Sequence, residues 1–273
     1  MTALMLLGMH RSYTSLVSRW LLDCGMNMGQ EFLPEGVGNS DGHFEDIDFF
    51  DLHRAALRQA QLPDNGMVDL SSPHFDEAGY DKLAFSGSIL DRATELTVRR
   101  KNSRLPFGWK EPRTCLFLPF YEKALDPFSI VLFRPYQEVV SSLVAREPKA
   151  IREFGYPGWK RPAYWVKKRT IEKRCFDLRH GFLEAWIHYN TKLLEHIHRV
   201  GAERVLVHDL NSIAEDPFAV TSKLREWGFA VEDRPLGALI KPLSDRDNLR
   251  FESSLIGRAQ EVTKQFDDII LQG

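Results

Sequence analysis

ALMLLGMHRSYTS, at residues 3–15, is the stretch that indicates the fold class most directly. Its apolar run over residues 3–7 predicts a buried strand that ends at Gly8. Apolar residues then recur at helical spacing: Leu16, Val17, Trp20 and Leu21. Gly25 is placed to end that helix. The stretch therefore predicts a strand, a polar loop and a helix in direct succession.

The same order recurs twice further along the chain. Residues 128–133, FSIVLF, are apolar except for Ser129, as in a strand buried on both faces, and Pro135 stands where the first turn of a helix tolerates proline. A third strand at residues 205–207 precedes a helix that begins near Pro217 and is closed by Gly228. Strands that alternate with helices predict a three-layer α/β/α fold with a mostly parallel central sheet, whose ligands bind beyond the carboxyl ends of the strands.

Length and composition are those of a globular chain. Its 273 residues, 43% hydrophobic and 27% charged, suffice for a sizeable core and exclude disordered, collagen-like and coiled-coil classes. We expect a single domain over residues 1–273. Residues 62–104 and 147–162, where Pro, Gly and Ser are scattered, are expected to hold the least regular structure and to act as lids or substrate loops.

Cysteine usage and hydropathy bound the class of protein further. The three cysteines are far apart and form no C-x-x-C pair, so neither a disulfide framework nor a zinc site is expected. The apolar run at the N-terminus is too short for a signal-peptide core, and no later run approaches the roughly 20 apolar residues of a spanning helix. We expect a cytoplasmic protein without stable membrane insertion. A net charge of −2 gives no reason to expect a nucleic-acid partner.

The loop at residues 8–15, GMHRSYTS, is P-loop-like without being a nucleotide-triphosphate loop. Gly8 and Ser15 fit the pattern G-x-x-x-x-G-K-[ST], but Tyr13 replaces the second glycine and Thr14 replaces the lysine, which disfavours an ordinary kinase or GTPase. A helix N-terminus still attracts a phosphate through its free N–H groups. Further donors are the side chains of Arg11, Ser12, Thr14 and Ser15. The loop is thus an anion cradle or, alternatively, a polar turn in which Thr14 or Ser15 caps the helix.

GMHRSYTS resembles the G-x-x-R-S-G-T-[ST] loop of sulfotransferases that use 3′-phosphoadenosine 5′-phosphosulfate (PAPS), whose bacterial members commonly carry GMHRSGTS. Only Tyr13 departs from it. Three further segments resemble the same family in the same order: residues 42–57 (GHFEDIDFFDLHRAAL), 109–120 (WKEPRTCLFLPF) and 133–143 (FRPYQEVVSSL). The resemblance implies metal-independent, in-line transfer of a sulfonate from PAPS to a hydroxyl or amine acceptor, which leaves the desulfonated product PAP.

The resemblance also implies which residues bind the donor. The loop would hold PAPS through Gly8, His10, Arg11, Ser12, Tyr13, Thr14 and Ser15. Arg134 and Ser142 stand at the spacing of the family's pair for the 3′-phosphate, one at a strand end and the other about two helical turns along. The alternative for this pair is a helix-capping arginine and an incidental serine.

Three residues are expected to be catalytic on the same resemblance: Arg11, Glu45 and Lys110. Arg11 would stabilise charge on the leaving oxygen. Lys110, in a segment similar to the family's K-D-P-R with Glu111 for the usual Asp, would share that charge. Glu45 matches the Glu of a G-[FYW]-x-E-type segment and is the first choice for the base that takes the acceptor proton. His43 and Glu111 are the other candidates.

Two rival functions and the acceptor stay open. The rivals are a P-loop phosphotransferase, which would need magnesium and normally the loop lysine, and a non-catalytic homologue in which Tyr13 narrows the cradle. Tyr13 can alternatively stack on substrate. Small molecules, carbohydrates, lipids and peptide tyrosines all remain possible acceptors, and the oligomeric state is open.

A basic segment covers residues 146–180. It holds eleven Lys or Arg against four acidic residues, a net charge of +7, whereas the rest of the chain carries −9. Its simpler interpretation is a solvated helix face, and the alternative is contact with PAPS or an acidic acceptor. Aromatic residues nearby would suit a sugar or a flat aglycone.

Overall fold

The structure, a computed structural model, describes residues 2–34, 36, 42–103, 105–236 and 249–272. These residues form a four-stranded parallel sheet in the order β2-β1-β3-β4. The strands are β1 (Ala3–Leu7), β2 (Phe107–Lys110), β3 (Phe128–Leu132) and β4 (Val205–His208). Leu6 of β1 is in register with Lys110 on one side and Ile130 on the other. The sheet confirms the predicted α/β class.

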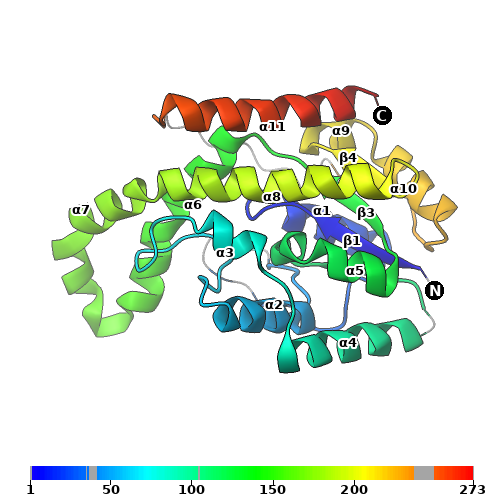
Figure 1. Cartoon of the computed structure of the whole chain (residues 1–273), viewed down its shortest axis with the longest axis horizontal. Coiled ribbons are helices and arrows are strands. Elements are labelled where there is room, and N and C mark those ends of the chain that lie inside the picture. Colours follow the sequence, from blue (N-terminus) through cyan, green and yellow to red (C-terminus); the bar gives the residue numbers. More distant parts are fainter. Residues whose placement is uncertain (1, 35, 37–41, 104, 237–248, 273) are drawn as a thin grey trace.

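Helices surround this sheet (Figure 1). In the described part of the chain they are α1 (Thr14–Asp23), α2 (Ile47–Gln59), α3 (Glu77–Asp81), α4 (Gly87–Asn102), α5 (Leu118–Leu125), α6 (Tyr136–Ala150), α7 (Arg161–Asp177), α8 (Arg179–Val200), α9 (Leu210–Glu215), α10 (Pro217–Glu226) and α11 (Ser253–Gln272). Within these residues, no helix has both the length and the apolar character that crossing a bilayer requires.

The two faces of the sheet are buried under different helices. Side chains of β1 alternate, so that Ala3, Met5 and Leu7 join one core while Leu4 and Leu6 join the other. The first core contains residues of α2, α4, α5, α6, α8 and α11, and the second contains residues of α1, α9 and α10. Apolar runs such as β1 and β3 follow from burial on both faces.

The strand order reverses between β1 and β3. The chain leaves β1 for β2 on one side and then crosses to β3 on the other. In open parallel sheets, ligands bind outside the carboxyl ends of the strands at the point where the order reverses. Residues 8–13 and 133–135 follow β1 and β3 at this point. The cradle loop and Arg134 therefore meet at the same edge of the sheet.

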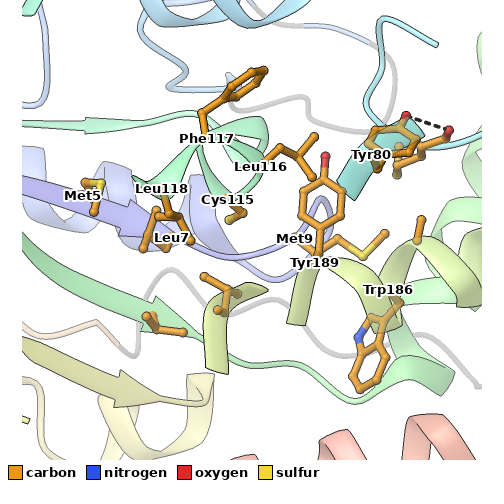
Figure 2. Close-up of a cluster of buried hydrophobic side chains, with 14 of the residues drawn as sticks. Met5, Leu7, Met9, Tyr80, Cys115, Leu116, Phe117, Leu118, Trp186 and Tyr189 are labelled. Carbon is orange, nitrogen blue, oxygen red and sulfur yellow. Dashed lines mark hydrogen bonds between the residues drawn. The ribbon is translucent and has the colours of Figure 1, made fainter. Parts of the chain in front are cut away.

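Large apolar side chains pack behind this edge of the sheet. Leu7 of β1 and Met9 of the loop lie in one buried cluster with Trp186 and Tyr189 of α8 (Figure 2). The indole N–H of Trp186 donates a hydrogen bond to the backbone oxygen of Arg134, 3.0 Å away. The long helix α8 thereby fixes the segment that follows β3.

Three of the four strands match the predicted ones, and β2 was not predicted. Its sequence, FGWK, has four residues, includes a glycine and ends on a lysine, so it carries little apolar pattern. Pairing with the central strand supplies what the local sequence lacks, because Ala3 and Phe107 begin a four-residue register. Lys110 is therefore the last residue of a buried strand, at the carboxyl edge of the sheet where ligands are expected to bind.

The expectation of little regular structure in residues 62–104 and 147–162 is wrong for parts of both. In the first, α4 forms because Ile89, Ala93, Leu96 and Thr97 recur on one buried helical face. The second contains the end of α6, a π-helical turn (Ile151–Gly155) and a 3-10 turn (Gly158–Lys160). Scattered Pro and Gly concealed these helical patterns.

Candidate active site

The loop after β1 is tight and strained. A side chain at Gly8 would put Cβ 3.0 Å from the backbone oxygen of Leu132 and 2.9 Å from Cγ2 of Thr14, so only glycine fits between β1 and β3. Arg11 and Tyr13 both adopt the left-handed region, with φ of 70° and 64°. Such a conformation costs a non-glycine residue roughly 1–2 kcal/mol. Strain of this kind persists where the surroundings enforce it, commonly at functional sites.

The first turn of α1 is open for a ligand. No side chain of the described residues caps it. Ser15 donates instead from Oγ to the backbone oxygen of His43, 3.0 Å away. The backbone N–H of the buried Ser12 turns back to the Met9 oxygen, at 3.1 Å. The alternative in which Thr14 or Ser15 caps the helix is therefore wrong, and the N–H groups of this turn can face an anion.

Arg11, Arg134 and Ser142 come together where the strand order reverses, beyond the ends of β1 and β3. Nε of Arg11 donates to Oγ of Ser142 at 2.9 Å, and Arg134 donates through Nη1 to the backbone oxygen of Arg11. Nε of Arg134 also pairs with Oε2 of Glu138 at 3.0 Å, one turn along α6. The Arg134 guanidinium lies over the Tyr13 ring, 4.1 Å from its centroid. Two segments more than 120 residues apart thus form one polar cluster.

Positive charge accumulates in this cluster. The pKa of Arg11 falls to about 10, first because the guanidinium is buried and then because Arg146 and Arg134 repel it. Sequence reasoning counted Arg146 in the basic segment but gave it no role. It lies on α6 one helical turn after Ser142, so its i, i+4 relation to a predicted site residue was the available signal. A bound anion would relieve the mutual repulsion of these arginines.

Lys110 reaches the cradle from the end of β2. The ammonium donates to Oγ of Ser15 at 3.0 Å, to the backbone oxygen of His43 at 2.7 Å and to Oε1 of Glu45 at 3.0 Å. Burial lowers the pKa of Lys110, against the opposing pull of Glu45. An ammonium has three N–H donors, and all three have acceptors here. To contact a ligand, Lys110 must therefore give up one of these hydrogen bonds.

Two candidates for the proton acceptor flank Lys110. Glu45 is buried and ion-paired with the ammonium. His43 is half-buried, and burial lowers the pKa of its imidazole, which keeps the ring neutral near pH 7. The segment that supplies both residues lies beside the cradle because its carbonyl oxygens accept hydrogen bonds from Ser15 and Lys110.

Glu111, the third candidate base, has a different setting. It is fully buried, with one oxygen 2.5 Å from Nδ1 of His53 and the other bonded to Nη1 of Arg113. Burial opposes its ionisation, but the charge of Arg113 and the hydrogen bonds from His53 and Arg113 outweigh burial and lower the pKa of Glu111. His53 in turn bonds the Tyr121 hydroxyl at 2.7 Å. Both carboxylate oxygens already have partners inside the core, which favours Glu45 or His43 over Glu111 as the base.

His10 lies in the loop as a neutral, buried imidazole. Burial, followed by the charges of Arg113, Arg146 and Lys110, lowers its pKa well below the usual value. Its Nε2 atom has no hydrogen-bond partner among the described residues, and its ring meets Tyr189 edge-on at 6.3 Å between centroids. An unsatisfied buried nitrogen at this place is a candidate contact for a ligand.

Comparisons with known proteins identify distant similarity in structure. The sequence matches no protein-family model and no curated protein. The chain is similar to the sulfotransferase domain from the curacin biosynthetic pathway, with 12% identity and a TM-score of 0.49 over 97% of each chain. It is similar to sulfotransferase STF9 from Mycobacterium avium at 16% identity and a TM-score of 0.49, over 96% of this chain and 68% of that one. A sulfotransferase from Alicyclobacillus acidocaldarius gives 14% identity and a TM-score of 0.44, over 98% and 92% of the two chains.

At this level of similarity, these neighbours assign no role to any residue of this chain. The loop residues, Arg134, Ser142, Lys110 and Glu45 all gather at the carboxyl ends of β1, β2 and β3. In the described residues, no group of three or more His, Cys, Asp or Glu is arranged to hold a metal ion.

Proposed function

We propose that this protein is a sulfotransferase that moves the sulfonate of PAPS to a hydroxyl or amine acceptor. The observation that carries the proposal is the joining of Arg11 to Ser142 and of Arg134 to the Arg11 backbone. These are the residues that the sequence resemblance links to the two phosphate ends of PAPS. Their meeting at the strand-order reversal supports one site for one nucleotide with an anionic group at each end.

The donor site is built to hold negative charge. The uncapped first turn of α1 offers backbone N–H groups to the 5′-phosphate, and Arg11 and Ser12 lie in the same loop. We assign the 3′-phosphate to Arg134 and Ser142, and Arg146 adds positive charge from α6, the helix that carries Ser142. Arginines suit this task because a guanidinium presents several N–H donors in a fixed plane.

The transfer itself needs a charge stabiliser and a proton acceptor. A new S–O bond forms to the acceptor oxygen while the bond from sulfur to the 5′-phosphate oxygen breaks, and PAP leaves with that electron pair. Arg11 stabilises the charge that develops on the leaving oxygen, with Lys110 nearby through Ser15. Glu45 takes the proton from the acceptor hydroxyl, and His43 is the alternative acceptor.

Calorimetric titration tests the donor assignment. PAPS, PAP and ATP are each titrated into the protein, with and without magnesium. We expect PAPS and PAP to bind without metal and ATP with magnesium to bind more weakly, because the loop lacks the P-loop lysine. Arg92→Ala, an exposed arginine on α4, is a control that should bind as the wild type does. Preference for ATP with magnesium, or absence of PAPS binding, overturns the proposal.

A further inference from the structure

A basic and aromatic hairpin projects from the body of the molecule. It comprises the end of α6, the π-helical turn at Ile151–Gly155, the 3-10 turn at Gly158–Lys160 and α7. In Figure 1 it extends at the left, away from the sheet and its covering helices. We call it the 148–177 hairpin.

The hairpin is held together by a small core of its own. Tyr164, Ile171 and Cys175 of α7 are buried, and Ile151 and Tyr156 pack against them. This cluster is separate from the two cores that cover the sheet. The apolar residues on the opposite side of α7 are therefore not needed for packing of the hairpin.

The two turns and α7 of the hairpin expose large apolar side chains. Trp159 is 85% exposed, Val166 87%, Phe154 74% and Trp165 58%. On α7, Trp165, Val166 and Phe176 lie at helical spacing on the outer face, together with the cations Arg169 and Lys173. A solvated helix face explains the cations but leaves the exposed indoles and valine without a role.

The charge of this surface is only partly neutralised. The acidic residues of the hairpin are each in ion pairs: Glu153 with Arg161, Glu172 with Lys168, and Asp177 with Lys173. Among the described residues, six further cations of the hairpin have no ion-pair partner: Lys149, Arg152, Lys160, Lys167, Arg169 and Arg174. The surface thus carries excess positive charge beside exposed aromatic rings.

We propose that the 148–177 hairpin docks on an anionic lipid bilayer surface. Lys and Arg are attracted to anionic headgroups, and exposed Trp and Phe side chains insert into the boundary between headgroups and acyl chains. Indoles favour this boundary because their ring is apolar while the N–H stays hydrated. Lys160 and Lys168 lie 5.4 and 5.3 Å from the rings of Trp159 and Trp165, so cation and ring enter together. Docking of this kind is peripheral and requires no spanning helix.

The tryptophans of the chain provide a direct readout. Trp20, Trp109, Trp186 and Trp227 are buried in the body, whereas Trp159 and Trp165 are exposed on the hairpin. The full chain is mixed with vesicles of phosphatidylcholine alone or with phosphatidylglycerol added, with brominated acyl chains as quenchers. We expect sedimentation with the anionic vesicles only, partial quenching of tryptophan fluorescence, and loss of binding at high salt.

Two variants separate the two contributions. Trp159→Ala with Trp165→Ala should remove quenching and weaken vesicle binding at least tenfold, and Lys167→Glu with Arg169→Glu should abolish the preference for anionic vesicles. The control is Arg92→Glu with Lys101→Glu, an equal charge change on exposed positions of α4. Thermal unfolding establishes that each variant is folded.

Three outcomes overturn the docking proposal. These are equal binding to neutral and anionic vesicles, binding without quenching, and hairpin variants that bind as the control does. Because vesicle binding is measured without turnover, its failure is independent of whether the protein is a sulfotransferase.

Discussion

The Arg11 side chain donates a hydrogen bond from Nε to Oγ of Ser142, 2.9 Å away, across 131 positions of the chain. One partner stands in the loop after the first strand and the other on the helix after the third. The bond joins the two halves of the site at the point where the strand order reverses. Substitutions at and around this contact test the proposed chemistry.

Arg11→Ala should abolish measurable turnover while the fold persists. Loss of a preorganised donor for developing charge commonly costs about 10²–10³ in rate. The substitution also removes a buried charge that Arg146 and Arg134 repel, so we expect no large fall in unfolding temperature. PAP release and thermal unfolding are measured together, with Arg92→Ala as the control. Turnover near that of the control contradicts the role of Arg11.

Arg134→Ala should lower the affinity for PAPS more than it lowers the affinity for the analogue that lacks the 3′-phosphate. A hydrogen bond to a charged group contributes about 1.5–3 kcal/mol, which corresponds to roughly 10- to 100-fold in affinity. Ser142→Ala should shift the same ratio less, because it removes a neutral hydroxyl. Calorimetry with both nucleotides gives the ratio for each variant. An equal loss for the two nucleotides would show that Arg134 acts only on loop structure, through its bonds to Arg11 and Glu138.

Glu45→Gln should lower turnover by about 10²-fold or more with unchanged PAPS affinity, because glutamine keeps an oxygen for Lys110 but cannot accept the acceptor proton. His43→Gln is the parallel variant. Steady-state rates and PAP titrations separate catalysis from binding. If Glu45→Gln keeps full turnover and His43→Gln loses it, the base is His43.

Much of the fold was predictable because its signals are local. The strand β1 is a continuous apolar run and β3 is interrupted only by Ser129, and Gly25 and Gly228 follow the ends of α1 and α10, with φ of 88° at each. The strand β2 was not predictable from its own residues, because β1 supplies its pairing partners. The Ser and Gly residues at the start of α4 concealed this helix, although its buried face has a regular helical period.

The site divides in the same way. Arg11, Lys110, Arg134 and Ser142 were reached through motif likeness, and the parallel sheet then places them at one edge. The hydrogen-bond partners that a side chain finds in the folded protein cannot be read from the sequence. Both oxygens of Glu111, for example, have partners in His53 and Arg113 that only folding brings near. Electrostatic neighbours such as Arg146 also depend on how α6 lies against the loop.

Stability should fall on mild acidification. Burial is the main cause that lowers the pKa of His10, His53 and His188 in the folded protein. In the unfolded chain a histidine titrates near 6.5, so below about pH 6.5 the unfolded state binds more protons than the folded one. The stability contributed by these neutral histidines is full above pH 6.5 and declines as the pH falls toward their folded values.

Urea unfolding between pH 7.5 and 5.5 measures this dependence. The midpoint should decrease with falling pH, and His10→Gln should flatten the curve by removing one of the contributing groups. His198→Gln, at an exposed position on α8, is the matched control. A midpoint that stays constant or rises over this range contradicts the prediction.

Tyr13 is the one departure from the sulfotransferase loop that residues 8–15 resemble, and its ring faces the Arg134 guanidinium. The left-handed backbone at Tyr13 favours glycine, whereas the cation–π contact with Arg134, at 4.1 Å, favours the ring. If the ring positions Arg134, Tyr13→Gly should raise the unfolding temperature slightly or leave it unchanged. The same substitution should lower the affinity for PAPS several-fold more than the affinity for the analogue without the 3′-phosphate. Tyr13→Phe keeps the ring and should bind both nucleotides as the wild type does. Tighter binding of both nucleotides by Tyr13→Gly would show instead that the ring obstructs the cradle, and unchanged binding with lost turnover would assign the ring to the acceptor.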